Sequence, residues 1–149
     1  MMSKTIFVAA LICSLFGGAA VQAKDSGKEK ACRKAKAWDC YNMALEAEKG
    51  DRGDEARKLY AIACREKKVT AACYNQGINL MQAEEFAESK KYFKIACDTK
   101  EFEKSGPACY NAGYVSGKMG DAKEKKTYWK LACNRGVERG CADAAALGD

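Results

Sequence analysis

The sequence predicts an all-α fold, an α/α superhelical solenoid of disulfide-stapled helix pairs. Two phrases recur along the 149 residues. Cys-Tyr-Asn occurs at 40–42, 73–75 and 109–111, and a second phrase that contains Ala-Cys occurs at 30–34 (KACRK), 62–66 (IACRE), 95–99 (IACDT) and 131–135 (LACNR). Successive cysteines of each series are 32 to 36 residues apart, a period typical of stacked helix pairs. The chain has one proline, and no two-residue alternation typical of strands persists.

The amino terminus has the features of a secretory signal peptide. Lys4 precedes an apolar run, and Val21-Gln22-Ala23 carries small residues where a signal peptidase cleaves. We therefore expect residues 1–23 to be removed and residues 24–149 to form one repeat domain of about three and a half repeats. A membrane anchor is the alternative, but the apolar segment is short and is followed by a long polar chain. A lipoprotein site at Cys13 is disfavoured by the bulky residue that precedes it.

The charged residues are numerous and of mixed sign. Without Lys4, 25 basic side chains face 20 acidic ones, a net charge of +5. Mixed charges are typical of solvated helical faces, and a mild positive balance favours acidic partners. No basic stripe is interleaved with aromatic residues, so we expect no nucleic-acid partner.

The helices follow in order along the chain. A short first helix ends near Cys32, and three pairs follow, each with a helix A that carries Cys-Tyr-Asn and a helix B that ends in Ala-Cys. In the third pair, Ser105 and Pro107 favour a start of helix A within 104–119, and Gly136 favours an end of helix B within 122–136. The equivalent B helices are 55–66 and 88–99, and a last A-type helix spans about 137–147.

The eight cysteines outside the signal predict a disulfide framework in an exported chain. Helix B ends near its cysteine, and a short loop leads to the cysteine in the first turns of the next helix A. The predicted pairs are Cys32–Cys40, Cys64–Cys73, Cys97–Cys109 and Cys133–Cys141. A structural zinc site is the alternative, but zinc favours closer cysteines, often with histidine, and the chain has no histidine. We expect no metal and no cofactor.

The segment ACYNAGYVSGKMGDAKEKKTYWKLACNRGVERGCADAA resembles a Sel1-like repeat, a relative of the tetratricopeptide repeat. With a cysteine in each helix, it resembles the exported cysteine-rich Sel1-like proteins of Helicobacter and related bacteria, over about residues 30–147. The glycine that follows Cys-Tyr-Asn-x is present as Gly77 and Gly113, whereas Ala44 stands in the first copy. The resemblance implies A helices that line a concave surface, and the binding of a ligand or protein there.

The resemblance also implies a second function, because members of the cysteine-rich branch are described as penicillin-binding proteins with weak β-lactam hydrolysis. A serine β-lactamase needs Ser-x-x-Lys and Lys-Thr-Gly. No serine here has lysine three residues later, and Lys126-Thr127 is followed by Tyr128. We therefore expect no catalytic residues, and we keep a weak β-lactam hydrolase as the alternative function.

The candidate ligand residues are the tyrosines and asparagines of the Cys-Tyr-Asn phrases, together with Tyr114, which follows Tyr110 by four residues on the same helix face. Their side chains either belong to the core or, as in related repeats, face the groove, where rings and amides suit an extended peptide. We expect a periplasmic or secreted monomer, without a membrane span after cleavage, that binds a protein, a peptide or a cell-wall fragment, or a β-lactam in the alternative. The candidates are Tyr41, Asn42, Tyr74, Asn75, Tyr110, Asn111 and Tyr114.

Overall fold

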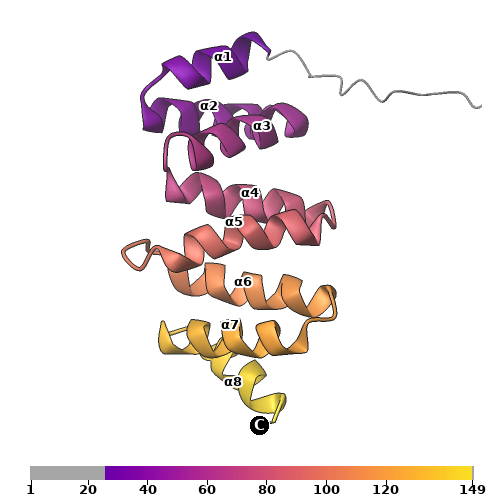
Figure 1. The fold of residues 1–149 in the computed structure, drawn as a ribbon. Coiled ribbons are helices and arrows are strands. Elements are labelled where there is room, and N and C mark those ends of the chain that lie inside the picture. Colours follow the sequence, from indigo (N-terminus) through magenta and orange to yellow (C-terminus); the bar gives the residue numbers. More distant parts are fainter. Residues whose placement is uncertain (1–25, 149) are drawn as a thin grey trace, which may run out of the picture.

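The computed structural model describes residues 26–148, which contain eight helices and no strand. The helices stack in sequence order, with α1 and α8 at opposite ends (Figure 1). Helices α2 to α8 each pack mainly against their neighbours along the chain, as expected for a solenoid, and α1 packs on both α3 and α2. The helices are α1 Gly27–Lys34, α2 Ala37–Lys49, α3 Gly53–Arg65, α4 Thr70–Gln82, α5 Phe86–Asp98, α6 Ser105–Lys118, α7 Ala122–Asn134 and α8 Glu138–Ala146.

The predicted all-α architecture is therefore confirmed. The helices α2, α4 and α6 are the three A helices, and α3, α5 and α7 are their B partners. The predicted signal peptide lies outside the described residues. None of the described helices is long and apolar enough to cross a membrane.

Helix ends follow local chemistry, with one correction. Ser26 caps α1 in a capping box with Glu29. Ser105 was predicted to cap α6, but it is the first helical residue and is buried, and Lys104 occupies the cap position without a side-chain hydrogen bond. At the end of α7, Gly136 has φ +79°, and its N–H donates to Cys133 O at 2.9 Å, which closes the helix as predicted.

The core runs along the stack between the A and B helices. It is built mainly from alanines, cysteines and the aromatic residue four positions before each B-helix cysteine. That aromatic residue is Tyr60 in α3, Phe93 in α5 and Trp129 in α7, and all three are buried. Small A-helix residues let the rings approach: a Cβ atom on Gly77 would lie 2.7 Å from the Phe93 ring, and one on Gly113 would lie 2.5 Å from Trp129 Cδ1. In the first helix pair, Ala44 stands at the position of these glycines, and it is fully buried.

The structure contains four disulfides, Cys32–Cys40, Cys64–Cys73, Cys97–Cys109 and Cys133–Cys141, the same pairs that the repeat predicts. Their Cα–Cα distances are 4.5 to 4.8 Å. The last three join a B helix to the following A helix, and the first joins α1 to α2. Bridges of this kind are typical of an oxidising compartment, extracellular or periplasmic.

Candidate functional site

The tyrosine of each Cys-Tyr-Asn phrase packs on the B-helix aromatic residue of its own repeat. Ring centroids are 5.9 Å apart for Tyr41 and Tyr60, and also for Tyr74 and Phe93. Tyr110 stacks on Trp129 at 5.7 Å with an interplanar angle of 12°. The three tyrosines are half-buried, so each has one face in the packing and part of its surface in solvent.

The asparagines differ from one repeat to the next. Asn75 Nδ2 donates to Tyr41 Oη at 3.2 Å and to Tyr60 Oη at 3.3 Å, so it joins the first repeat to the second. Tyr60 Oη in turn donates to Glu48 at 2.8 Å. Burial raises the pKa of Tyr60 most and the hydrogen bond to Glu48 raises it further, whereas the hydrogen bond from Asn75 acts in the opposite direction. Asn42 is exposed, one repeat earlier.

The same contact between repeats recurs at the far end of the stack. Asp143 in α8 occupies the repeat position of Asn75, and it accepts a hydrogen bond from Tyr110 Oη at 2.6 Å. Burial and this carboxylate raise the pKa of Tyr110 to about 12. The tyrosine therefore stays protonated and donates to Asp143 at neutral pH.

Tyr74 is covered by the chain segment between α5 and α6. Phe102 lies 6.1 Å from the Tyr74 ring, and Lys104 Nζ lies 5.4 Å over it. Both residues belong to the segment between Cys97 and Cys109, which at 12 residues is the longest separation of the four bridges. The sequence shows this longer loop, but it carries no signal that Phe102 packs on a candidate ligand residue.

Three of the predicted ligand residues line one pocket of about 390 Å³, which we call the α6 groove. Tyr110, Asn111 and Tyr114 form its α6 wall, and Tyr114 is 40% exposed. The end of α4, the turn into α5 and Arg139 of α8 supply the rest of its lining. The full lining is Met81, Gln82, Glu84, Phe86, Tyr110, Asn111, Tyr114, Lys118 and Arg139.

Cationic groups lie over the aromatic rings of the α6 groove. Lys118 Nζ is 5.5 Å from the Tyr114 ring centroid, and the Arg139 guanidinium is 5.5 Å from that of Tyr110. Arg139 also pairs with Asp143 at 3.6 Å. The groove therefore combines apolar surface from Met81 and Phe86 with aromatic rings, two amides, two cations and the carboxylate of Glu84. The sequence did not predict Arg139, because its role depends on how α8 packs beside α6.

A second hollow of about 390 Å³ lies at the starts of α2 and α4. Its lining includes Trp38, which is 61% exposed, and Phe102. The Trp38 ring packs edge-on against Tyr41 at 5.4 Å. Trp38 was not predicted as a site residue, although a tryptophan two positions before the first Cys-Tyr-Asn cysteine is visible in the sequence.

Hydrolytic chemistry has little support in the described residues. Among residues 26–148, Ser116 is the serine whose hydroxyl donates to a carboxylate: its Oγ donates to Glu124 at 3.2 Å, and Glu124 pairs with Lys90. However, Ser116 is fully buried, so a substrate cannot reach its oxygen. Residues 26–148 hold no group of three or more His, Cys, Asp or Glu placed to bind a metal ion.

The geometry thus divides the predicted ligand residues in two. Tyr41 and Asn75 hydrogen-bond each other, and Tyr74 is covered by Phe102, whereas Tyr110, Asn111 and Tyr114 meet in an open groove.

Comparison of the chain with protein-family models and with curated proteins finds no match to either.

Proposed function

We propose that the protein is an exported, disulfide-linked scaffold of Sel1-like repeats that binds an extended peptide segment of a protein in the α6 groove. The observation that supports this most is the meeting of Tyr110, Asn111 and Tyr114 in one open pocket. These residues come from a single repeat, yet the groove also takes residues from the repeats before and after it. A binding site shared by neighbouring repeats is typical of solenoids.

The chemistry of the groove favours a peptide. The Asn111 side chain offers one acceptor and two donors, which matches the alternating N–H and C=O groups of an extended backbone. Tyrosine supplies contact area with few rotatable bonds, so the entropy cost of binding is small. Lys118 and Arg139 favour an acidic side chain, and Met81 and Phe86 favour an apolar one.

β-Lactam hydrolysis, the other function that the resemblance implies, has weaker support. A serine nucleophile needs a base within hydrogen-bond reach and access to the substrate. Ser116 has a carboxylate partner but no access, and Thr127 donates its hydroxyl to the Lys123 carbonyl at 2.9 Å within its own helix.

The proposal is tested by selecting binders from a library of displayed random peptides with the folded protein. The affinity of a selected peptide is then measured for the wild type and for Asn111→Ala and Tyr114→Ala. We expect each change to weaken binding about tenfold or more, because hot-spot residues contribute above about 1.4 kcal/mol. Asn42→Ala is the matched control: it removes the amide at the same repeat position, outside the α6 groove, and should leave affinity unchanged.

Two results would count against the proposal. One is a library that yields no binder above background. The other is a binder whose affinity falls equally with Asn42→Ala and Asn111→Ala, because a site elsewhere on the stack would then be involved. Circular dichroism of each variant separates a loss of binding from a loss of folding.

A further inference from the structure

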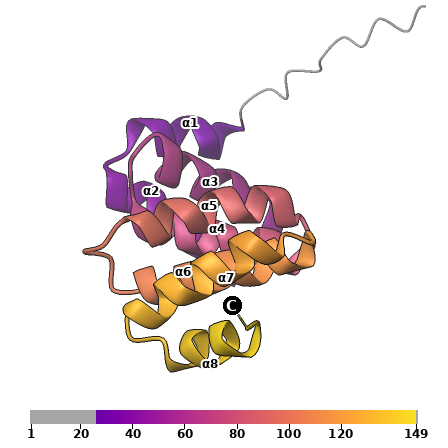
Figure 2. The ribbon, with the colours of Figure 1, turned by 60° about the horizontal axis from the view of Figure 1, so that its bottom comes forward.

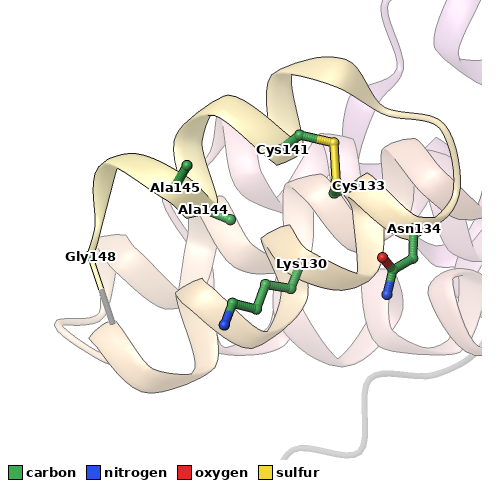
Figure 3. Close-up of a pocket in the computed structure, with 7 residues that line it drawn as sticks. All are labelled: Lys130, Cys133, Asn134, Cys141, Ala144, Ala145 and Gly148. Atoms are coloured by element: carbon green, nitrogen blue, oxygen red, sulfur yellow. A yellow bond between two sulfur atoms is a disulfide. The ribbon is translucent and has the colours of Figure 1, made fainter.

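The four disulfides do not share one environment. The six cysteines of the first three bridges have at most 2% of their surface exposed. In the fourth bridge, Cys141 is exposed and Cys133 is partly exposed. Figure 3 shows this bridge between α7 and α8, at the edge of a pocket of about 510 Å³. A reagent in solvent therefore reaches Cys141 but not the other bridges.

Burial of the third bridge has a specific cause. Arg135, at the end of α7, donates to the Cys97 carbonyl oxygen, and its Nη1 lies 3.0 Å from Cys109 Sγ. A residue of the following repeat thus covers the Cys97–Cys109 bridge. In Figure 2, α8 lies at one end of the stack beside α7, and no further helix of the described chain covers its bridge.

The helix held by the exposed bridge buries few of its own residues. Only Gly140 and Ala144 are buried among the nine residues of α8. A helix of that length is marginal in water by itself. Besides packing on α7, α8 contacts α6 through Asp143, which accepts from Tyr110, and through Arg139, which lies over the Tyr110 ring. The bridge is therefore a main constraint on α8.

We propose that Cys133–Cys141 is a site of thiol–disulfide exchange, and that its reduction releases α8. The co-reactant is a dithiol, either a small molecule or an exported protein with a pair of reactive cysteines. Its thiolate attacks Cys141 Sγ, the S–S bond breaks, and Cys133 leaves as a thiolate, which gives a mixed disulfide. The second thiol of the dithiol then displaces Cys141, so the dithiol is oxidised and the bridge is reduced by two electrons.

Release of α8 has a consequence for the α6 groove. Arg139 lines that groove and Asp143 fixes the Tyr110 hydroxyl, and both residues move with α8. Reduction at the end of the stack would therefore take Arg139 out of the groove lining and free the Tyr110 hydroxyl, while the first three bridges hold the other repeats. This step rests on the proposed function, whereas the exchange site itself does not.

The exchange site is tested by limited reduction of the folded full chain with dithiothreitol, followed by alkylation of free thiols and peptide mapping. Cys32–Cys40 is a matched control, because it also spans eight residues and lies near the other end of the stack, but it is fully buried. We expect Cys133 and Cys141 to be alkylated about ten times faster or more than Cys32 and Cys40, since the rate depends on access. Equal rates, or faster opening of Cys32–Cys40, would overturn the proposal.

A second measurement follows the helix without any reductant. Hydrogen exchange is compared between the wild type and the double variant Cys133→Ser with Cys141→Ser. We expect faster exchange in α8 and unchanged protection in α2 to α6, and unchanged protection of α8 would overturn its release. If α8 is released but a selected peptide binds the variant as tightly as the wild type, the bridge does not regulate peptide binding in the α6 groove. If no peptide binds either protein, the proposed function fails, while the alkylation order still supports the exchange site.

Discussion

At the scale of single residues, the tyrosine of each Cys-Tyr-Asn phrase has two roles. Its ring packs on the aromatic residue of helix B, and in two repeats its hydroxyl contacts the next repeat. Tyr41 meets Asn75, and Tyr110 meets Asp143, which occupies the same repeat position. Packing within and between repeats therefore explains why Cys-Tyr-Asn recurs, whether or not these residues also bind a ligand.

The close approach of aromatic rings to glycine gives the first prediction. Gly77→Ala and Gly113→Ala should each lower the free energy of unfolding by about 1–3 kcal/mol, because the added Cβ would overlap Phe93 or Trp129. Urea denaturation measures the change. Gly53→Ala is the control, since a Cβ atom there meets nothing within 4 Å. Equal effects of all three changes would show that ring contact is not the cause.

The raised pKa of Tyr110, about 12 in the folded chain, gives a prediction for alkaline pH. The ordinary value of about 10 applies after unfolding, so folding favours the protonated phenol. This contribution to stability is complete below about pH 10 and is lost as the pH rises through about 12. Tyr60 acts in the same direction. We expect Tyr110→Phe to lose less stability than the wild type across this range, and an identical loss in urea denaturation would contradict the assignment.

At the scale of helices and turns, the three A–B turns share one backbone form. Each has a residue with positive φ just after the A helix: Asp51 at 56°, Glu84 at 59° and Gly120 at 80°. Gly50-Asp51 in the first of these turns and Gly120-Asp121 in the last are therefore not equivalent, although the two dipeptides are the same. In the first, the aspartate takes the left-handed conformation, and in the last, the glycine does.

Two of the three turns place a residue other than glycine at the position with positive φ, which predicts two stabilising substitutions. Asp51→Gly and Glu84→Gly should raise the free energy of unfolding by about 0.5–1 kcal/mol each, because glycine adopts positive φ without the steric cost of a Cβ. Gly120→Ala is the opposite control and should lower it by about 1 kcal/mol. Thermal melts of the three variants measure the effect. A lower melting temperature for Asp51→Gly would show that its side chain contributes more than its backbone strain costs.

The order and type of the helices could be predicted from sequence because the repeat carries its own signals. The spacing of apolar residues predicted the helices, Gly136 predicted the end of the last B helix, and the two series of cysteines predicted the disulfide pairs. The site could be predicted only in part. The contacts of Asn75 with Tyr41, of Phe102 with Tyr74 and of Arg139 with Tyr110 join residues 28 to 34 positions apart. Such contacts depend on how successive repeats are rotated, which a single sequence does not specify.

At the scale of the whole molecule, stability comes from many weak contacts between neighbours together with the four bridges. Ion pairs such as Arg33–Glu66, Arg57–Glu85 and Lys90–Glu124 connect successive helix pairs. Exposed pairs of this kind contribute little each. Each bridge closes a loop of about ten residues and contributes about 2–3 kcal/mol in the loop-entropy model.

Reduction of all four bridges should therefore unfold the chain or lower its melting temperature sharply, because the loss is comparable with the net stability of a small domain. Thermal melts followed by circular dichroism, with and without a strong reductant, measure this. Reduction of Cys133–Cys141 alone should leave most of the helical signal. A fully reduced protein that melts like the oxidised one would show that apolar stacking suffices.

The central claim is that the α6 groove binds an extended peptide, and amide chemical shifts test it most directly. Isotope-labelled protein is titrated with a peptide selected from the library, and the shifted amides are mapped on the helices. We predict shifts concentrated in Tyr110–Lys118, at the end of α4 and around Arg139, with α1 and α2 unchanged. Shifts that cluster at the starts of α2 and α4, around Trp38, would contradict the claim and place the site in the other hollow.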